Sequence, residues 1–200
     1  MQTTSRPQRQ TRTPGTRERI VEATSRLLQR QGYEGTSVKE IARAAGATLS
    51  SVYHFFPGGK QELAVAAIRH GDAEFAELLS ASLAREADPA AAVVACTDAL
   101  AAGLRDSGWS DGCPVTATAL ETAGRIPEIQ RACTQTYEHW QRLVAERLVT
   151  AGFAEADARE LAWTVVTTIE GAEGAAQVFR SATPLHLAGR HLARLLDAYR

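Results

Sequence analysis

Hydrophobic positions recur every three or four residues along most of the chain, which is the spacing of an α-helix with one buried face. Between Val38 and Ala45 the apolar residues occupy positions i, i+3, i+4 and i+7 of a short helix. Ser37 can cap this helix, and Glu40 stands three residues later, as in a capping box. No alternating run typical of a β-strand interrupts the pattern. The sequence therefore predicts an all-α fold.

Glycine and proline divide the helical pattern into about nine segments. Thr16 can cap the first, and Gly32 and Gly46 supply the turns that follow the first two. Thr48 opens the third, which stops at Pro57. The expected helices cover residues 16–32, 37–46, 48–57, 60–85, 89–106, 114–124, 127–152, 155–180 and 184 onward.

The charge is distributed unevenly along the chain. Residues 1–62 carry ten Lys and Arg against five Glu, a net charge of +5, and this leaves −6 for the rest of a chain whose net charge is −1. A basic N-terminal part predicts a polyanionic partner for that part only. We expect a disordered basic tail over 1–15, a basic domain over 16–63 and a larger helical domain over 64–200.

The second and third expected helices, joined at Gly46, form a helix-turn-helix, in which one helix braces against the DNA backbone and the other enters the major groove. Val52 and Phe56 must face the other helices, which leaves hydroxyl, imidazole and aromatic groups for double-stranded operator DNA. Leu49 can either pack inward or contact a thymine methyl, and the aromatic candidates can also be core residues. The expected DNA contacts are Thr36, Ser37, Thr48, Ser50, Ser51, Tyr53, His54, Phe55 and Lys60.

The stretch GYEGTSVKEIARAAGATLSSVYHFFPGGKQEL, residues 32–63, resembles the N-terminal domain of TetR-family transcription regulators. The resemblance implies a homodimer whose first three helices bind DNA and whose later helices hold an inducer and the dimer interface. It also implies DNA-backbone contacts by Thr36, Tyr53, His54 and Lys60. The FPGGK loop and the stretch GCPVTATALE, residues 112–121, are similar to the LmrA/YxaF-type branch, which often controls efflux or detoxification genes.

The later helices contain residues suited to a small hydrophobic or aromatic ligand, because such sites combine apolar walls with a few polar groups. Glu170 stands out, since it interrupts an otherwise apolar run. The tryptophans can instead fill the core, and the glutamates can be solvated. The candidates are Trp109, Thr116, Glu121, Tyr137, Trp140, Trp163, Thr167 and Glu170.

The last two helices offer a dimer interface. Hydrophobic residues of the last helix follow a heptad pattern over two heptads, and small residues of the preceding helix permit close helix approach. A core within one chain would produce the same heptad pattern. The candidate interface residues are Gly171, Ala175, Leu185, Ala188, Leu192, Leu195 and Tyr199.

Several other classes of protein are disfavoured. There is no nucleophile elbow, phosphate loop or paired metal-binding motif, so we expect neither catalytic residues, nor a cofactor, nor a metal site. Three widely spaced cysteines suit a reducing cytoplasm, and no stretch approaches the roughly 18 apolar residues of a membrane span. The sequence thus predicts a cytoplasmic regulator, most simply a dimeric repressor released from operator DNA by a small-molecule inducer. The alternatives are a DNA-binding regulator or architectural protein without such a ligand, or an activator.

Overall fold

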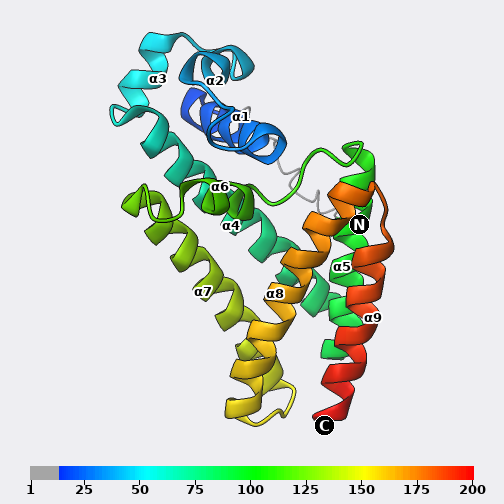
Figure 1. Cartoon of the computed structure of the whole chain (residues 1–200). Coiled ribbons are helices and arrows are strands. Elements are labelled where there is room, and N and C mark those ends of the chain that lie inside the picture. Colours follow the sequence, from blue (N-terminus) through cyan, green and yellow to red (C-terminus); the bar gives the residue numbers. More distant parts are fainter. Residues whose placement is uncertain (1–13) are drawn as a thin grey trace, which may run out of the picture.

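The computed structural model describes residues 14–200, and every regular element in this range is an α-helix (Figure 1). The predicted tail therefore lies almost entirely outside the described residues. The helices are α1 (Thr16–Gln31), α2 (Val38–Ala44), α3 (Leu49–Phe55), α4 (Gly59–Arg85), α5 (Pro89–Asp106), α6 (Pro114–Thr122), α7 (Pro127–Thr150), α8 (Glu155–Phe179) and α9 (Thr183–Ala198).

Local signals place most of these boundaries where the sequence predicts them. The capping box is present, since the Ser37 side chain accepts from the Glu40 amide at 3.2 Å and the Glu40 carboxylate accepts from the Ser37 amide at 3.0 Å. Gly46 has φ 59°, the left-handed conformation that a β-carbon resists. The expected cap at Thr16 is wrong, because Gly15 is the N-cap and its amide donates to Glu18.

Helices α1–α3 enclose a small core at one end of the molecule. Ile20, Ile41, Val52 and Phe56 are buried there together with Leu63 from the first turns of α4. The expected domain boundary after residue 63 falls inside α4, a single long helix that runs from this core into the body (Figure 1). Because α4 belongs to both cores, a displacement of α4 in the body would move the first three helices as well.

The body is built from the lower part of α4 and from α5–α9. Helix α9 packs closely against α5, and a β-carbon at Gly189 would lie 2.2 Å from the Thr97 hydroxyl. This packing buries Leu185, Ala188 and Leu192 within the chain, so the heptad pattern of these three residues reflects a core and not a dimer seam. Among the other candidates on α9, Leu195 is half-buried and Tyr199 is exposed.

Candidate DNA-binding surface and ligand cavity

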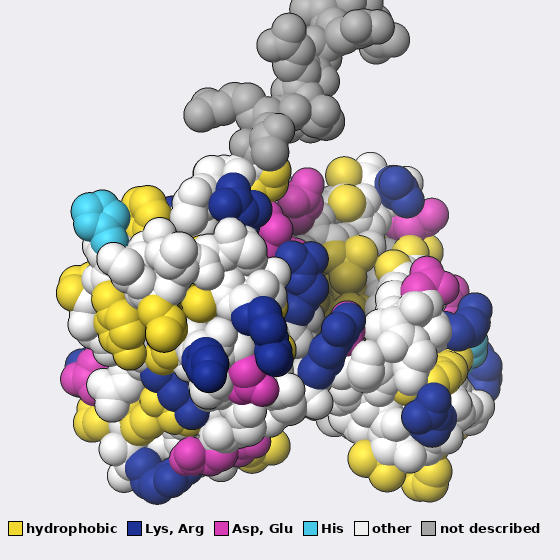
Figure 2. All heavy atoms as spheres, turned by 90° about the horizontal axis from the view of Figure 1, so that it is seen from above, with side chains coloured by type: hydrophobic (Ala, Val, Ile, Leu, Met, Phe, Trp, Pro, Cys, Tyr) yellow, Lys and Arg dark blue, Asp and Glu magenta, His cyan; other side chains and the backbone are white. Residues whose placement is uncertain are grey.

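Helix α3 presents a polar surface at the end of the molecule. Thr48 caps the helix, accepting from the Ser51 amide at 3.1 Å, and its hydroxyl lies 2.9 Å from the Ser51 hydroxyl. Ser50, Tyr53 and His54 are exposed on the same short helix. Figure 2 looks down on this end and shows Lys and Arg side chains spread among acidic, polar and hydrophobic ones. The surface can therefore combine phosphate contacts with contacts to base edges.

Two of the residues expected to contact DNA instead make contacts within the fold. Thr36 is only 2% exposed, and its hydroxyl donates to the Gly32 carbonyl at 2.7 Å, so the structure contradicts a DNA contact by this side chain. The turn after α1 needs that donor, because the last carbonyl groups of a helix have no partner within the helix. Phe55 is half-buried and packs against the core of α1–α3. Its ring is edge-on to His54, with 5.1 Å between the ring centroids.

The expected contacts at the starts of α2 and α4 are Ser37, which is exposed, and Lys60, which is half-buried. The ammonium group of Lys60 lies 4.2 Å from the centroid of the Tyr33 ring, a cation–π contact that the sequence did not indicate. Leu49 is 44% exposed and lies outside the core, so of its two possible orientations the structure adopts the outward one.

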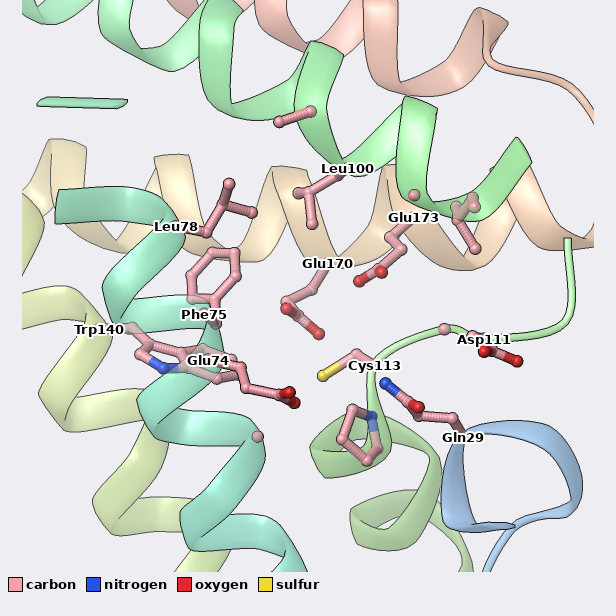
Figure 3. Close-up of a pocket in the computed structure, with 16 residues that line it drawn as sticks. Gln29, Glu74, Phe75, Leu78, Leu100, Asp111, Cys113, Trp140, Glu170 and Glu173 are labelled. Carbon is pink, nitrogen blue, oxygen red and sulfur yellow. The ribbon is translucent and has the colours of Figure 1, made fainter. Parts of the chain in front are cut away.

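A cavity of about 230 Å³ lies in the body, between α4, α5, α8 and the loop before α6 (Figure 3). Its apolar walls include the rings of Phe75 and Trp140, whose centroids are 4.6 Å apart. Glu170 and Glu173 enter from α8, and Cys113 enters from the loop. Such a mixture of apolar walls and a few polar groups is typical of small-molecule sites.

Five of the eight residues expected to bind a ligand lie around Glu170, which is itself one of the eight. The Thr116 hydroxyl donates to the Glu170 carboxylate and lies 2.7 Å from the Tyr137 hydroxyl. Trp140 lines the cavity beside Glu170. On the other side of Glu170, a groove is lined by Tyr137 together with the exposed Trp163 and Thr167.

Trp109 and Glu121 do not belong to this cavity. Trp109 packs against the small core between α5, α8 and α9. The Glu121 carboxylate instead accepts from the Glu34 amide at 2.7 Å. Glu121 therefore links α6 to the turn between α1 and α2, because a glutamate is long enough to reach a free amide across this contact.

Cys113, Glu170 and Glu173 form a cluster that the sequence did not reveal as a group. One donor atom of each, the Cys113 Sγ and a carboxylate oxygen of each glutamate, lies within 4.8 Å of the others. Burial raises the pKa of Glu170, although hydrogen bonds from Thr116, Cys113 and Tyr137 oppose this effect. Burial, and then the charge of Glu170, raise the pKa of Glu173 to about 8. Burial also raises the pKa of the Cys113 thiol.

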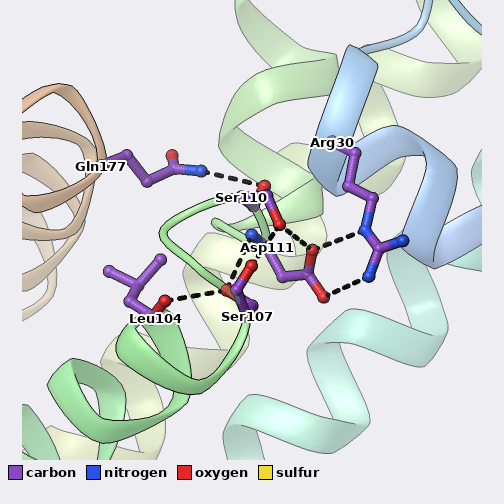
Figure 4. Close-up of polar contacts among 6 residues, drawn as sticks. All are labelled: Arg30, Leu104, Ser107, Ser110, Asp111 and Gln177. Carbon is purple, nitrogen blue, oxygen red and sulfur yellow. Dashed lines mark hydrogen bonds and ion pairs between the residues drawn. The ribbon is translucent and has the colours of Figure 1, made fainter. Parts of the chain in front are cut away.

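The loop before α6 connects the cavity to α1. The Arg30 guanidinium donates to both carboxylate oxygens of Asp111, at 2.7 and 3.1 Å (Figure 4). This two-bond contact holds the pKa of Asp111 below its usual range. Asp111 and the neighbouring Gly112 both line the cavity. A ligand that displaces this loop would therefore act directly on a helix of the DNA-binding end.

A second connection joins the end of α6 to the same region. Arg125 forms an ion pair with Glu34 at 2.8 Å, next to the Glu121 contact. Gly32, at φ 68°, lies so close that a β-carbon there would be 2.0 Å from a Glu121 carboxylate oxygen. The segment from Asp111 to Arg125 thus contacts the DNA-binding end at two separate points.

Known sequence families match both parts of the chain. The model for bacterial regulatory proteins of the tetR family matches residues 20–67. The model for the C-terminal domain of LmrA/YxaF-like transcriptional regulators matches residues 89–191. The chain belongs to the TetR family.

Relatives of this TetR-family chain cover most of its length. It is 32% identical to the HTH-type transcriptional regulator YxaF of Bacillus subtilis, over 90% of this chain and 94% of the relative. It is 31% identical to the regulator LmrA of the same organism, over 84% and 90% of the two chains. A crystal structure of the regulatory protein TetR from Rhodobacter sphaeroides superposes with a TM-score of 0.80 at 27% identity, covering 90% of this chain and 97% of that one.

The family places this TetR-type regulator among DNA-binding transcription regulators, and not among enzymes. It belongs to the LmrA/YxaF-like branch, as the GCPVTATALE stretch indicated. Of the helices between residues 14 and 200, none has the length and hydrophobicity needed to cross a membrane.

Proposed function

We propose that this TetR-family regulator is a homodimeric repressor that binds operator DNA and releases it when a small hydrophobic or aromatic inducer enters the cavity of the body. The observation that carries this proposal is the pair of hydrogen bonds between Arg30 of α1 and Asp111 at the cavity wall. An inducer that moves the loop before α6 would, through this contact, also move α1. Residues 16–63 would form the DNA-binding domain and residues 64–200 the sensor and dimerisation domain.

An exposed strip on α8 supports the dimer. Its members are spaced by three or four residues, so they share one helix face. They are Trp163, Thr167, Gly171, Gly174 and Val178, and all are exposed. A β-carbon at Gly171 or Gly174 would meet nothing within 4 Å in the chain, so packing within the chain does not explain these glycines. Because glycine within a helix costs roughly 0.5–1 kcal/mol relative to alanine, close approach of a second α8 is the simplest reason for them.

Release of DNA would follow from a shift between two arrangements of the dimer. In the DNA-bound arrangement, two α3 helices stand about one turn of DNA apart, roughly 34–36 Å, to meet two half-sites. An inducer that binds better to a different spacing shifts the population toward it, and nearly complete release requires a preference of about 5.5 kcal/mol. The proposed DNA contacts are Ser37, Thr48, Ser50, Ser51, Tyr53, His54 and Lys60, with the backbone around Thr36.

The test is a gel-shift titration of the full-length protein on its own upstream intergenic DNA, with excess competitor DNA and then with a panel of small molecules. We expect a discrete complex that survives the competitor and that at least one compound dissolves. A specific complex that no compound affects would favour the alternative of a regulator or architectural protein without a ligand. Reporter transcription in the presence and absence of the protein would separate repression from activation.

A further inference from the structure

All the charged side chains that line the cavity are acidic. Among the described residues, its lining includes Glu74, Asp111, Glu170 and Glu173, and no Lys, Arg or His. Asp111 is neutralised by Arg30 from outside the cavity. Glu74 lies 3.4 Å from the His70 imidazole, which is outside the lining, and Glu170 and Glu173 have no basic partner in the lining. The cavity therefore offers carboxyl groups and no cationic side chain, which disfavours anionic ligands.

Glu173 is the acidic group for which the fold supplies the least compensation. It is 8% exposed and its side chain points into the cavity (Figure 3). Glu170 is equally buried, but its carboxylate accepts a hydrogen bond from Thr116. For Glu173, among the described residues, only burial and the like charge of Glu170 act on the pKa, and both raise it. An ionised carboxylate buried without a hydrogen-bond donor is costly, so Glu173 is held in its neutral form unless a cationic donor enters the cavity.

The rest of the cavity wall is hydrocarbon and aromatic. Phe75 and Trp140 present rings on one side, tilted by 56° to each other, and Leu78 and Leu100 lie near them (Figure 3). Aromatic faces attract cations as well as apolar groups. The volume is slightly below the range of about 300–1,000 Å³ found for drug-sized ligands, so the occupant is compact.

We propose that the cavity binds a compact lipophilic organic cation, with an ammonium group donating to Glu170 and Glu173 and its ring or alkyl part against Phe75 and Trp140. This inference rests on the proposed function for its regulatory meaning, and it names the ligand class of the same site. An ammonium group beside Glu170 and Glu173 would lower the pKa of both carboxyl groups, so that Glu173 releases its proton to solvent, and the resulting charge-assisted hydrogen bonds would give most of the selectivity.

A metal ion explains less of the same site. Cys113, Glu170 and Glu173 could supply three donors, but burial keeps the thiol protonated at neutral pH, and a thiolate is the form that binds metals. A metal would also leave the aromatic and aliphatic walls without an occupant. An organic cation uses both the acidic corner and the apolar wall.

The test compares matched pairs of probes that differ in charge: benzylamine, phenethylamine and naphthylmethylamine against benzyl alcohol, phenethyl alcohol and naphthylmethanol. Binding to the full-length protein is measured by thermal shift and by quenching of tryptophan fluorescence. We expect at least one amine to bind at least about tenfold more tightly than its alcohol. The variant Glu173→Gln should remove this preference while keeping the shape of the site, whereas Glu146→Gln, on the exposed face of α7, should retain it.

Three results would overturn the inference. They are alcohols binding as tightly as the amines, no amine binding at all, or stabilisation by Zn²⁺ that Cys113→Ser abolishes.

Operator release, measured with the same probes, separates this inference from the proposed function. Amines that bind through Glu173 without releasing DNA would refute ligand control and leave the cation site intact. Release by neutral or anionic compounds alone would support ligand control and refute the cation site.

Discussion

Lys60 combines a cation–π contact with a proposed role in DNA binding. Its ammonium group lies against the Tyr33 ring at the start of α4, where free backbone amides also favour anions. We predict that Lys60→Ala weakens binding to specific and non-specific DNA alike. Each phosphate contact makes the slope of log K against log salt more negative by about 0.9. Loss of one contact per subunit should therefore reduce the magnitude of the slope of a dimer by about 1.8. Gel shifts at several salt concentrations measure this slope.

Tyr53→Phe is the matched uncharged change at the same surface. It removes an exposed hydroxyl and no charge, so affinity should fall while the salt slope stays constant. Arg190→Ala, exposed on α9 away from α3, serves as the control and should change neither quantity. An unchanged slope in Lys60→Ala would show that Lys60 does not contact phosphate.

Glu173 should make folding stability depend on pH. Its pKa is about 8 in the folded chain and about 4.5 when unfolded, so the folded state binds the extra proton between these values. This proton's contribution to the free energy of unfolding is complete below about pH 4.5. It is lost as the pH rises toward 8, by up to about 1.4 kcal/mol per pH unit. Thermal unfolding across this range should show a smaller decline for Glu173→Gln. Parallel curves for variant and parent would contradict the burial of a titrating carboxylate.

Between elements, the contact of α1 with the loop before α6 is the link that the proposed switch requires. We predict that Arg30→Lys, which keeps a positive charge beside Asp111 but loses the two-bond contact, leaves inducer binding to free protein unchanged and raises several-fold the inducer concentration needed to release operator DNA. The measurements are ligand titrations by fluorescence and by gel shift. Arg26→Lys is the control, since Arg26 pairs with Glu22 inside α1. Equal inducer responses in the two variants would remove this contact from the mechanism.

The elements also show which features a sequence can reveal. The capping box at Ser37 and the proline at Pro127 act through neighbouring residues, so the helix boundaries they imply were predictable. Arg30 and Asp111 are 81 positions apart, and nothing local marks them as partners. Glu170 stood out in an apolar run, but nothing local to Glu173 marked its burial or its closeness to Cys113.

At the scale of the whole molecule, the heptad pattern of α9 was ambiguous for a physical reason. A helix buried against its own chain and a helix buried against a partner present the same apolar spacing. Leu185 and Leu192 proved to be core residues, whereas the glycines of α8 have free space beside them. Free space beside a helix glycine can be judged only from three-dimensional packing, and it moves the expected interface toward α8.

This interface can be tested without damaging the fold of one subunit. Val178 is 80% exposed on the α8 strip, so Val178→Asp should leave the monomer folded but place two charges at the contact of two α8 helices. We predict monomers by light scattering after gel filtration and a loss of operator affinity of at least about a hundredfold, because a single α3 then meets a single half-site. Val149→Asp, also at an exposed valine but on α7, should remain dimeric.

Gly174→Arg provides independent support, since arginine favours a helix by nearly 1 kcal/mol over glycine and should stabilise the isolated subunit while preventing close approach of a second α8. A dimeric Val178→Asp together with a monomeric Val149→Asp would place the interface at α7 instead of at the α8 strip.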